Sequence, residues 1–185
     1  MIYPILSFGN NILRAEAKSI EKDYKDLQKL IEDLFETMYA GNGVGLAAPQ
    51  IGFSLRLFVI DGNPYSKDEP KLKDFKKVFI NAKIVEEKGT KWLFNEGCLS
   101  FPKLREDVSR LPEIKINYYD ENFNFHEEYY DGITARIIQH EYDHIIGKLF
   151  VDHLSPLKRR LLKRKLSDIS KGNVEVDYKM KFSAK

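Results

Sequence analysis

Cysteine is nearly absent from this sequence. A single cysteine among 185 residues excludes an internal disulfide and gives no indication of an oxidising compartment. Long hydrophobic runs are missing too: none approaches the ~20 residues of a membrane-spanning helix, and the first residues lack the basic and apolar regions of a signal peptide. An excess of one charge is also missing, because a net charge of +2 is too small to indicate nucleic-acid binding by itself. We therefore expect a cytoplasmic protein without membrane association.

The composition that remains is that of an ordinary globular protein. It is 43% hydrophobic and 31% charged, which excludes a disordered or collagen-like chain. The length fits one domain over residues 1–185 with a sizeable core.

Hydrophobic periodicity predicts helices in three places. Apolar residues recur at spacings of three and four over residues 26–39, which indicates an amphipathic helix that ends at Gly41. A second helix is expected over residues 134–146, with Gly147 at its C-terminal cap. A third helix is expected over residues 156–171.

Short strands are expected between the helices. Residues 55–60 and 78–85 read as strands, and residues 114–119 and 123–130 as a β-hairpin. The polar, lysine-rich residues 63–77 read as an exposed loop. Strands and helices without regular alternation indicate an α+β fold. We expect mostly antiparallel β-sheets around the second predicted helix, with one helix N-terminal and one C-terminal to it.

The strongest chemical signal is the motif HEYDH at residues 140–144, within the second predicted helix. His140 and His144 are four residues apart and so lie on one face of a helix, where both imidazoles can bind one divalent metal ion. Glu141 is rotated by about 100° from His140, so it can lie beside an open coordination position without being a ligand. The alternative is a pair of surface histidines, but the apolar face of the helix favours a pair that points into the fold.

Two histidines are too few for a catalytic metal site, which typically has three protein ligands and one open position. The candidates for the third ligand are His126, His153, a carboxylate and Cys98. His153 follows the helix and would be reached only by a turn back. Cys98 offers a thiolate beside Gly97, where the backbone can approach a ligand closely. A lone cysteine is more often a small buried apolar residue, so the spacing leaves the third ligand open.

Three sequence blocks, taken in order, bear on the choice of the third metal ligand. They are GVGLAAPQ at residues 43–50, EGCLS at residues 96–100 and QHEYDH at residues 139–144. In these blocks the sequence resembles the peptide deformylases, and the resemblance extends from residues 4–6 to LSPL at residues 154–157 and into the C-terminal helix. It implies a metal-dependent amidohydrolase that removes the N-formyl group from the formyl-methionine of newly made polypeptides and releases formate.

The resemblance also implies a set of site residues. Cys98, His140 and His144 would hold the metal with water in the fourth position, and Glu141 would act as general base and acid. Fe²⁺ is the ion usual in the family, and Zn²⁺, Ni²⁺ or Co²⁺ suit the same donors. The oxyanion donors it implies are the side-chain amide of Gln50 and the backbone N–H of Leu99. The substrate-binding residues it implies are Gly43, Val44, Gly45, Glu96, Gly97 and Arg105.

Residues around the ligands also map onto the family pattern, with two departures. Glu96 is expected to pair with Arg110, a contact that matters for ligand orientation only if it is buried. Arg136 stands where related sequences often have an aliphatic residue in the methionine pocket, and we interpret it as pointing to solvent. The segment 63–77 is long for the family and is expected to change a surface loop rather than the site.

The predicted C-terminal helix is strongly basic. Residues 156–171 carry seven basic residues and one acidic residue, which gives +6, whereas residues 1–155 carry 20 basic and 25 acidic residues, which gives −5. A basic face neutralises phosphates, so docking on ribosomal RNA, close to nascent chains, is one hypothesis. A packing helix with a solvated basic face is the other. Residues 172–185 are expected to form a flexible tail.

Two other functions remain open from the residues alone. A zincin-type metallopeptidase would take His153 or a late glutamate as its third ligand instead of Cys98. A structural zinc domain that binds RNA would need four protein ligands, which one cysteine and four histidines disfavour.

Overall fold

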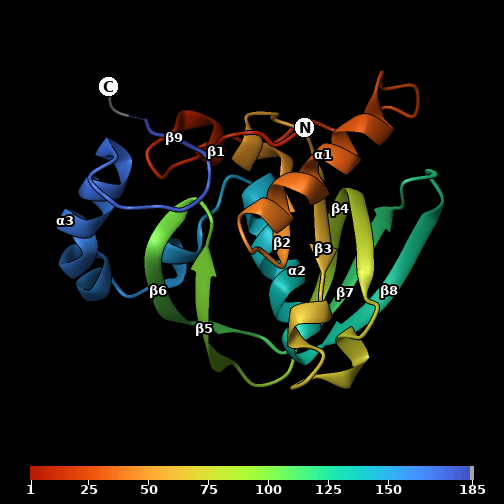
Figure 1. Cartoon of the computed structure of the whole chain (residues 1–185). Coiled ribbons are helices and arrows are strands. Elements are labelled where there is room, and N and C mark those ends of the chain that lie inside the picture. The colour runs from red at the N-terminus through yellow and green to blue at the C-terminus, as the bar shows by residue number, and fades with distance from the viewer. Residues whose placement is uncertain (184–185) are drawn as a thin grey trace.

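The central element is a five-stranded antiparallel sheet with strand order β2-β3-β4-β7-β8, seen in Figure 1. The computed structural model describes residues 1–183. The strands of this sheet are β2 (Gly45–Ala47), β3 (Leu57–Asp61), β4 (Lys76–Lys88), β7 (Glu113–Tyr119) and β8 (Phe125–Asp131).

Helices cover both faces of this sheet. The three α-helices are α1 (Leu27–Ala40), α2 (Gly132–Ile145) and α3 (Pro156–Lys171). In β3, Leu57 and Val59 are buried in one hydrophobic cluster with α1, whereas Phe58 and Ile60 are buried in another with α2. Side chains alternate across a strand, so α1 and α2 lie on opposite faces. The predicted α+β fold, with antiparallel sheets around a central helix, is confirmed.

A β-hairpin forms a second, smaller sheet beside α2. It consists of β5 (Trp92–Cys98) and β6 (Phe101–Arg110). Phe101, Leu104 and Val108 of β6 are buried in a third hydrophobic cluster, which joins this hairpin to the segment after α2 and to α3. The register shifts between Gly97 and Cys98, so a bulge bends the end of β5, and the chain turns at residues 99–100.

The two ends of the described chain meet in a third sheet. Strand β1 (Ile5–Leu6) pairs in parallel with β9 (Met180–Lys181), and Figure 1 shows the two strands side by side near α3. None of the helices within residues 1–183 combines the length and the apolar character that crossing a membrane requires.

The elements with strong periodicity agree with the sequence prediction. Helices α1 and α2 begin and end within two residues of the expected bounds. Gly147 follows the end of α2 with φ of +71°, the left-handed conformation in which glycine commonly ends a helix.

The hairpin β5–β6 was not predicted, and two expectations are corrected by the structure. The segment 63–77 is more than an exposed loop, because it contains two short 3-10 helices, Leu72 is fully buried, and β4 already begins at Lys76. The described part of the expected flexible tail, residues 172–183, returns to form β9 against β1.

Candidate active site

Helix α2 presents two histidines one turn apart. The ring centroids of His140 and His144 lie 5.3 Å from each other. The helix itself is held by Ile138 and Ile145, which are fully buried in the cluster against the central sheet. The histidines are therefore fixed on a rigid element, as the spacing of the motif predicts.

Strand β5 brings Cys98 to the same place. Its Sγ lies 3.3 Å from Nε2 of His144. Donor atoms from Cys98, His140 and His144 all lie within 4.8 Å of one another. The bulge at the end of β5 turns Cys98 toward α2, so three possible ligands from distant parts of the sequence converge.

The other histidines considered as third ligands lie elsewhere. Nε2 of His126 is 2.8 Å from Oδ2 of Asp120 in the β7–β8 turn. Nε2 of His153 is 2.7 Å from Oδ2 of Asp143, and His153 does not belong to the converging group. A zincin-type ligand set with His153 is thus not what the structure assembles.

The chemistry of the three donors fits a divalent metal ion. One thiolate and two imidazoles form a donor set typical of transition metals. Burial lowers the pKa of His144 to about 3, so its imidazole is neutral, as a ligand must be. Burial acts in the same direction on His140, but hydrogen bonds with Cys98 and Glu96 raise its pKa well above the usual value. These groups favour a positive charge among them, which a cation supplies.

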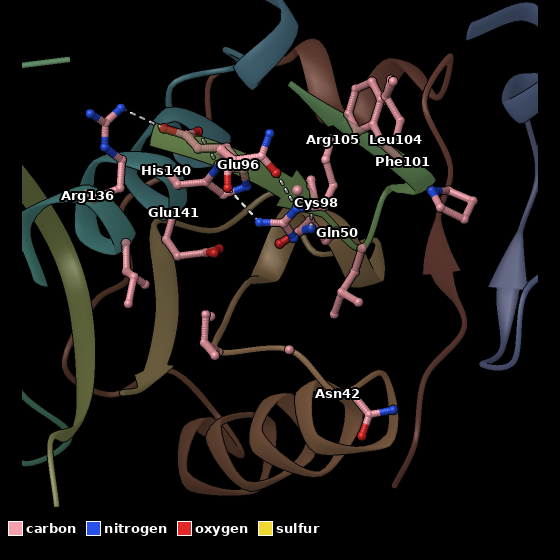
Figure 2. A pocket seen from close by; sticks show the side chains of 18 of the residues that line it. Asn42, Gln50, Glu96, Cys98, Phe101, Leu104, Arg105, Arg136, His140 and Glu141 are labelled. Atoms are coloured by element: carbon pink, nitrogen blue, oxygen red, sulfur yellow. Dashed lines mark hydrogen bonds and ion pairs between the residues drawn. The ribbon is translucent and has the colours of Figure 1, made fainter. Parts of the chain in front are cut away.

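Glu141 is buried beside these donors. Figure 2 shows its carboxylate extending from α2 into the cleft, on the side of Cys98 and Gln50. Its Oε2 has no hydrogen-bond partner within the described residues, and burial raises its pKa to about 7. A Cβ atom at Gly45 would collide with this carboxylate, so the glycine of β2 leaves the space that Glu141 occupies.

Gln50 faces Cys98 from the opposite wall. It sits in the short 3-10 helix Ala48–Ile51, where its Oε1 accepts a hydrogen bond from the backbone N–H of Ala47 at 2.8 Å. This contact orients the side-chain amide, whose Nε2 lies 3.5 Å from Sγ of Cys98 and donates to Oγ of Ser100 at 3.2 Å. Gln50 is 2% exposed, so its amide is a fixed donor at the cleft.

Glu96 is the centre of a buried polar network. Its carboxylate accepts hydrogen bonds from Arg110 Nε at 2.8 Å, from Arg136 Nη1 at 2.9 Å and from His140 Nδ1 at 2.9 Å. Burial alone would raise the pKa of Glu96, but the bonds from His140 and Arg110 hold it well below its usual range. Arg110 also donates to Asp143 at 2.7 Å. The expected contact between Glu96 and Arg110 is present, and both side chains are buried.

The interpretation of Arg136 as solvent-facing is wrong. This residue is 2% exposed, and besides Glu96 it donates to the backbone carbonyls of Val108 and Trp92. Its guanidinium lies over the indole ring of Trp92, 4.6 Å from the centroid. Arg136 therefore bridges α2 and the β5–β6 hairpin, and it stays charged there because Glu96 and the carbonyls offset its burial.

These groups line a cleft of about 350 Å³. One wall carries the backbone of Gly43, Val44 and Gly45, and the other carries the end of β5. The substrate-binding candidates all line it: Gly43, Val44, Gly45, Glu96, Gly97 and Arg105. Arg105 is an exposed residue whose Nε donates to Asn95 at 2.8 Å. Figure 2 places Asn42 on the far side of the cleft, at the end of α1.

Aromatic residues that line the cleft were missed from the sequence, among them Tyr65 and Tyr178. Tyr65, from the segment 63–77, lines it beside Phe94, with ring centroids 6.4 Å apart. The expectation that this segment changes only the surface is therefore wrong. Tyr178 lines the cleft from the C-terminal segment. Neither residue belongs to a motif, and only long-range packing brings them here.

Comparison with known proteins gives one family. Residues 2–160 match the model of the polypeptide deformylase family. The peptide deformylase of Christiangramia forsetii is 53% identical over 189 aligned residues, which cover 98% of this chain and 96% of that protein. The peptide deformylase of Cytophaga hutchinsonii is 51% identical over 185 residues, with 100% of both chains covered.

Solved structures agree with this comparison. The peptide deformylase of Thermus thermophilus gives a TM-score of 0.82 at 37% identity, covering 93% of this chain and 99% of that chain. A peptide deformylase from Legionella pneumophila gives 0.80 at 42% identity, covering 94% and 98%.

Proposed function

The chain belongs to the polypeptide deformylase family, and from this premise we propose how its cleft performs the reaction. The enzyme hydrolyses the formyl amide at the N-terminus of formyl-methionyl polypeptides, which yields formate and a free amino group. The observation that carries the proposal is the convergence of Cys98, His140 and His144 beside the buried carboxylate of Glu141.

We propose Cys98, His140 and His144 as the metal ligands. When bound, a divalent ion supplies Lewis-acid polarisation of the formyl group and lowers the pKa of water. Of the ions that this donor set suits, we propose Fe²⁺ as the native one, because the resemblance in the motif blocks implies it. Metal analysis of anaerobically purified protein tests this assignment.

Glu141 is proposed to move the proton. A buried carboxylate with a pKa of about 7 is divided between its two protonation states near neutral pH, which suits a group that must take and then return a proton. It accepts the proton of the attacking water and delivers it to the amide nitrogen as the C–N bond breaks. The unpartnered Oε2 supports this role, because no protein donor within the described residues competes for it.

Gln50 and Leu99 are proposed as the oxyanion donors. The amide of Gln50 is fixed by its bond to Ala47, and the backbone N–H of Leu99 directly follows Cys98 in sequence. Donors that are held in place before the reaction stabilise the developing negative charge most. Gly43, Val44 and Gly45 on one wall, and Glu96 and Gly97 on the other, are proposed to flank the bound peptide, with Arg105 at the mouth of the cleft.

Formate release tests the proposed site. Wild-type enzyme and Cys98→Ala are assayed with a formyl-methionyl tripeptide, and metal content is measured on the same samples. We expect Cys98→Ala to be folded, free of metal and inactive. A Cys98→Ala protein with one metal equivalent and normal turnover would contradict the ligand set. Cleavage of an internal peptide bond by the wild type would instead favour the metallopeptidase alternative.

We also propose that the enzyme acts in the cytoplasm at the ribosome, where its formylated substrates are made. Helix α3 supports this, because it carries seven basic side chains and exposes Leu157 and Leu161 by 67% and 73%. Cosedimentation with ribosomes should weaken as salt rises and should be lost when Lys163, Arg164 and Lys165 are changed to glutamate. Salt-independent binding, or unchanged binding of that variant, would contradict docking through α3.

A further inference from the structure

The last described residues lie beyond the family match, which ends at residue 160, yet they reach the active site. We call residues 172–183 the C-terminal strap. Gly172 ends α3 in the left-handed conformation, with φ of +79°, which reverses the chain. The strap then runs to β1, as Figure 1 shows.

Backbone hydrogen bonds fix the strap in position. The N–H groups of Ile5 and Ser7 donate to the carbonyls of Lys179 and Lys181 at 2.9 and 3.0 Å. Near its end, Ser183 Oγ donates to the carbonyls of Phe8 and Ser170. These bonds tie the strap to the N-terminal segment and to α3 at residues that follow Tyr178.

Tyr178 carries the strap into the cleft. Its side chain lines the cavity, and its hydroxyl donates to the backbone carbonyl of Leu99 at 2.7 Å. The ring packs against the hydrophobic cluster that contains Ile5, where Leu99 also packs. Burial raises the pKa of Tyr178, so the hydroxyl remains a donor at the pH of the reaction.

The turn at residues 99–100, which contains Leu99, is held at two further points. The carbonyl of Ser100 accepts from the N–H of Phe8 at 2.9 Å, and Oγ of Ser100 accepts from Gln50 at 3.2 Å. Residues 99 and 100 have no regular strand partners at this turn, so these bonds set the orientation of their peptide groups. Of the three, only the bond from Tyr178 acts on Leu99 itself.

We infer that Tyr178 is a positioning residue for the reaction: its hydroxyl anchors the carbonyl at one end of Leu99 and so restrains the residue whose N–H, at the other end, is the oxyanion donor. This inference rests on the proposed role of Leu99 as an oxyanion donor. It assigns to the strap a function in turnover, beyond packing. A misaimed donor lowers the stabilisation of the transition state more than that of the bound substrate.

The test is Tyr178→Phe, which keeps the ring and removes only the hydroxyl. We expect kcat to fall by about 10- to 100-fold, with KM within about twofold and the metal retained. Ser183→Ala is the matched control, because it removes a strap contact that does not touch Leu99. It should leave kcat at the wild-type value, and the two variants should have similar melting temperatures.

Two results would overturn the inference. A Tyr178→Phe enzyme with wild-type kcat would show that the hydroxyl only helps packing, and an equal fall in kcat for Ser183→Ala would show a general loosening of the strap. Gln50→Ala, measured beside them, shows whether the role of Tyr178 or the oxyanion assignment is wrong. If its kcat falls while that of Tyr178→Phe does not, only the role of Tyr178 is wrong. If neither falls, the oxyanion assignment itself is wrong, and the inference is lost with it.

Discussion

Nδ1 of His140 lies 2.9 Å from Oε2 of Glu96. A carboxylate that is held ionised can only accept, so Nδ1 carries a proton and Nε2 is the ring nitrogen that remains to bind the metal. The same carboxylate is held in turn by Arg110 and Arg136. The orientation of a metal ligand on α2 is therefore determined by charges from β6 and from α2 itself.

Replacing Glu96 with glutamine should lower the affinity for the metal. Glu96→Gln removes the negative charge that fixes the ring of His140 and leaves the buried guanidinium of Arg136 without its carboxylate partner, whereas Arg110 keeps Asp143. We expect metal affinity to fall by about 10- to 100-fold, measured as metal retained after dialysis against graded chelator. Glu106→Gln, a change on the same hairpin, should retain wild-type affinity. Equal retention by Glu96→Gln and wild type would show that His140 needs no such partner.

The glycine at position 45 is predicted to be required for the placement of Glu141. A Cβ atom there would meet the carboxylate of Glu141 and displace it. Gly45→Ala should keep its metal and its fold but lose turnover, by roughly 10²-fold or more, because the proton acceptor is misplaced. A Gly45→Ala enzyme with normal kcat would contradict the role of Glu141.

A feature of the fold or the site could be predicted from the sequence when the residues that determine it are close together in the sequence. Helix α2 and its histidine pair follow from local spacing. The hairpin β5–β6 was missed because the sequence of β5 shows no clear alternation of apolar residues and only one of its seven residues is buried. Arg136 was misplaced because the partner that stabilises it, Glu96, is 40 residues away in sequence.

Dependence on distant residues also explains why the strap and the structure of segment 63–77 were not predicted. Strand β9 has two residues and pairs with the other end of the chain, which leaves no local signal. Tyr65 lies in a segment that Leu72 anchors, because Leu72 is buried close to Gly62, and the polar composition of the segment gives no sign of this anchor. The chemical motifs were readable since each needs only neighbouring residues, whereas their supporting residues were not.

A second polar cluster predicts how stability depends on pH. Glu128 on β8 accepts hydrogen bonds from Lys77 at 2.8 Å and from Tyr118 at 2.6 Å, and also from Tyr130. Burial alone would raise its pKa, but these bonds lower it to about 2, below the value of about 4.3 in an unfolded chain. Its contribution to stability is therefore fully present above the unfolded pKa and is lost as the pH falls toward 2.

Urea unfolding at pH 6 and pH 3 checks this. The difference in unfolding free energy between wild type and Glu128→Gln should be largest at pH 6 and should shrink at pH 3. Any loss of metal at low pH affects both proteins alike and cancels in this difference. A difference for Glu128→Gln that grows on acidification would refute the prediction.

The last prediction separates ligand from base. Glu141 is adjacent to His140 but is absent from the converging donors, so Glu141→Gln should retain the metal held by Cys98, His140 and His144. What it loses is proton transfer, typically worth about 10²–10⁴ in rate. The loss should lie at the upper end, since one carboxylate serves both the attacking water and the leaving nitrogen. His140→Ala should lose metal and turnover together.

Metal analysis and formate assays on Glu141→Gln and His140→Ala test this distinction between ligand and base. A metal-free Glu141→Gln would make Glu141 a ligand, and a metal-loaded variant with near-normal turnover would require another base. A metal-loaded, inactive protein is expected, because the geometry leaves the carboxylate free of both the ligand set and any protein donor within the described residues.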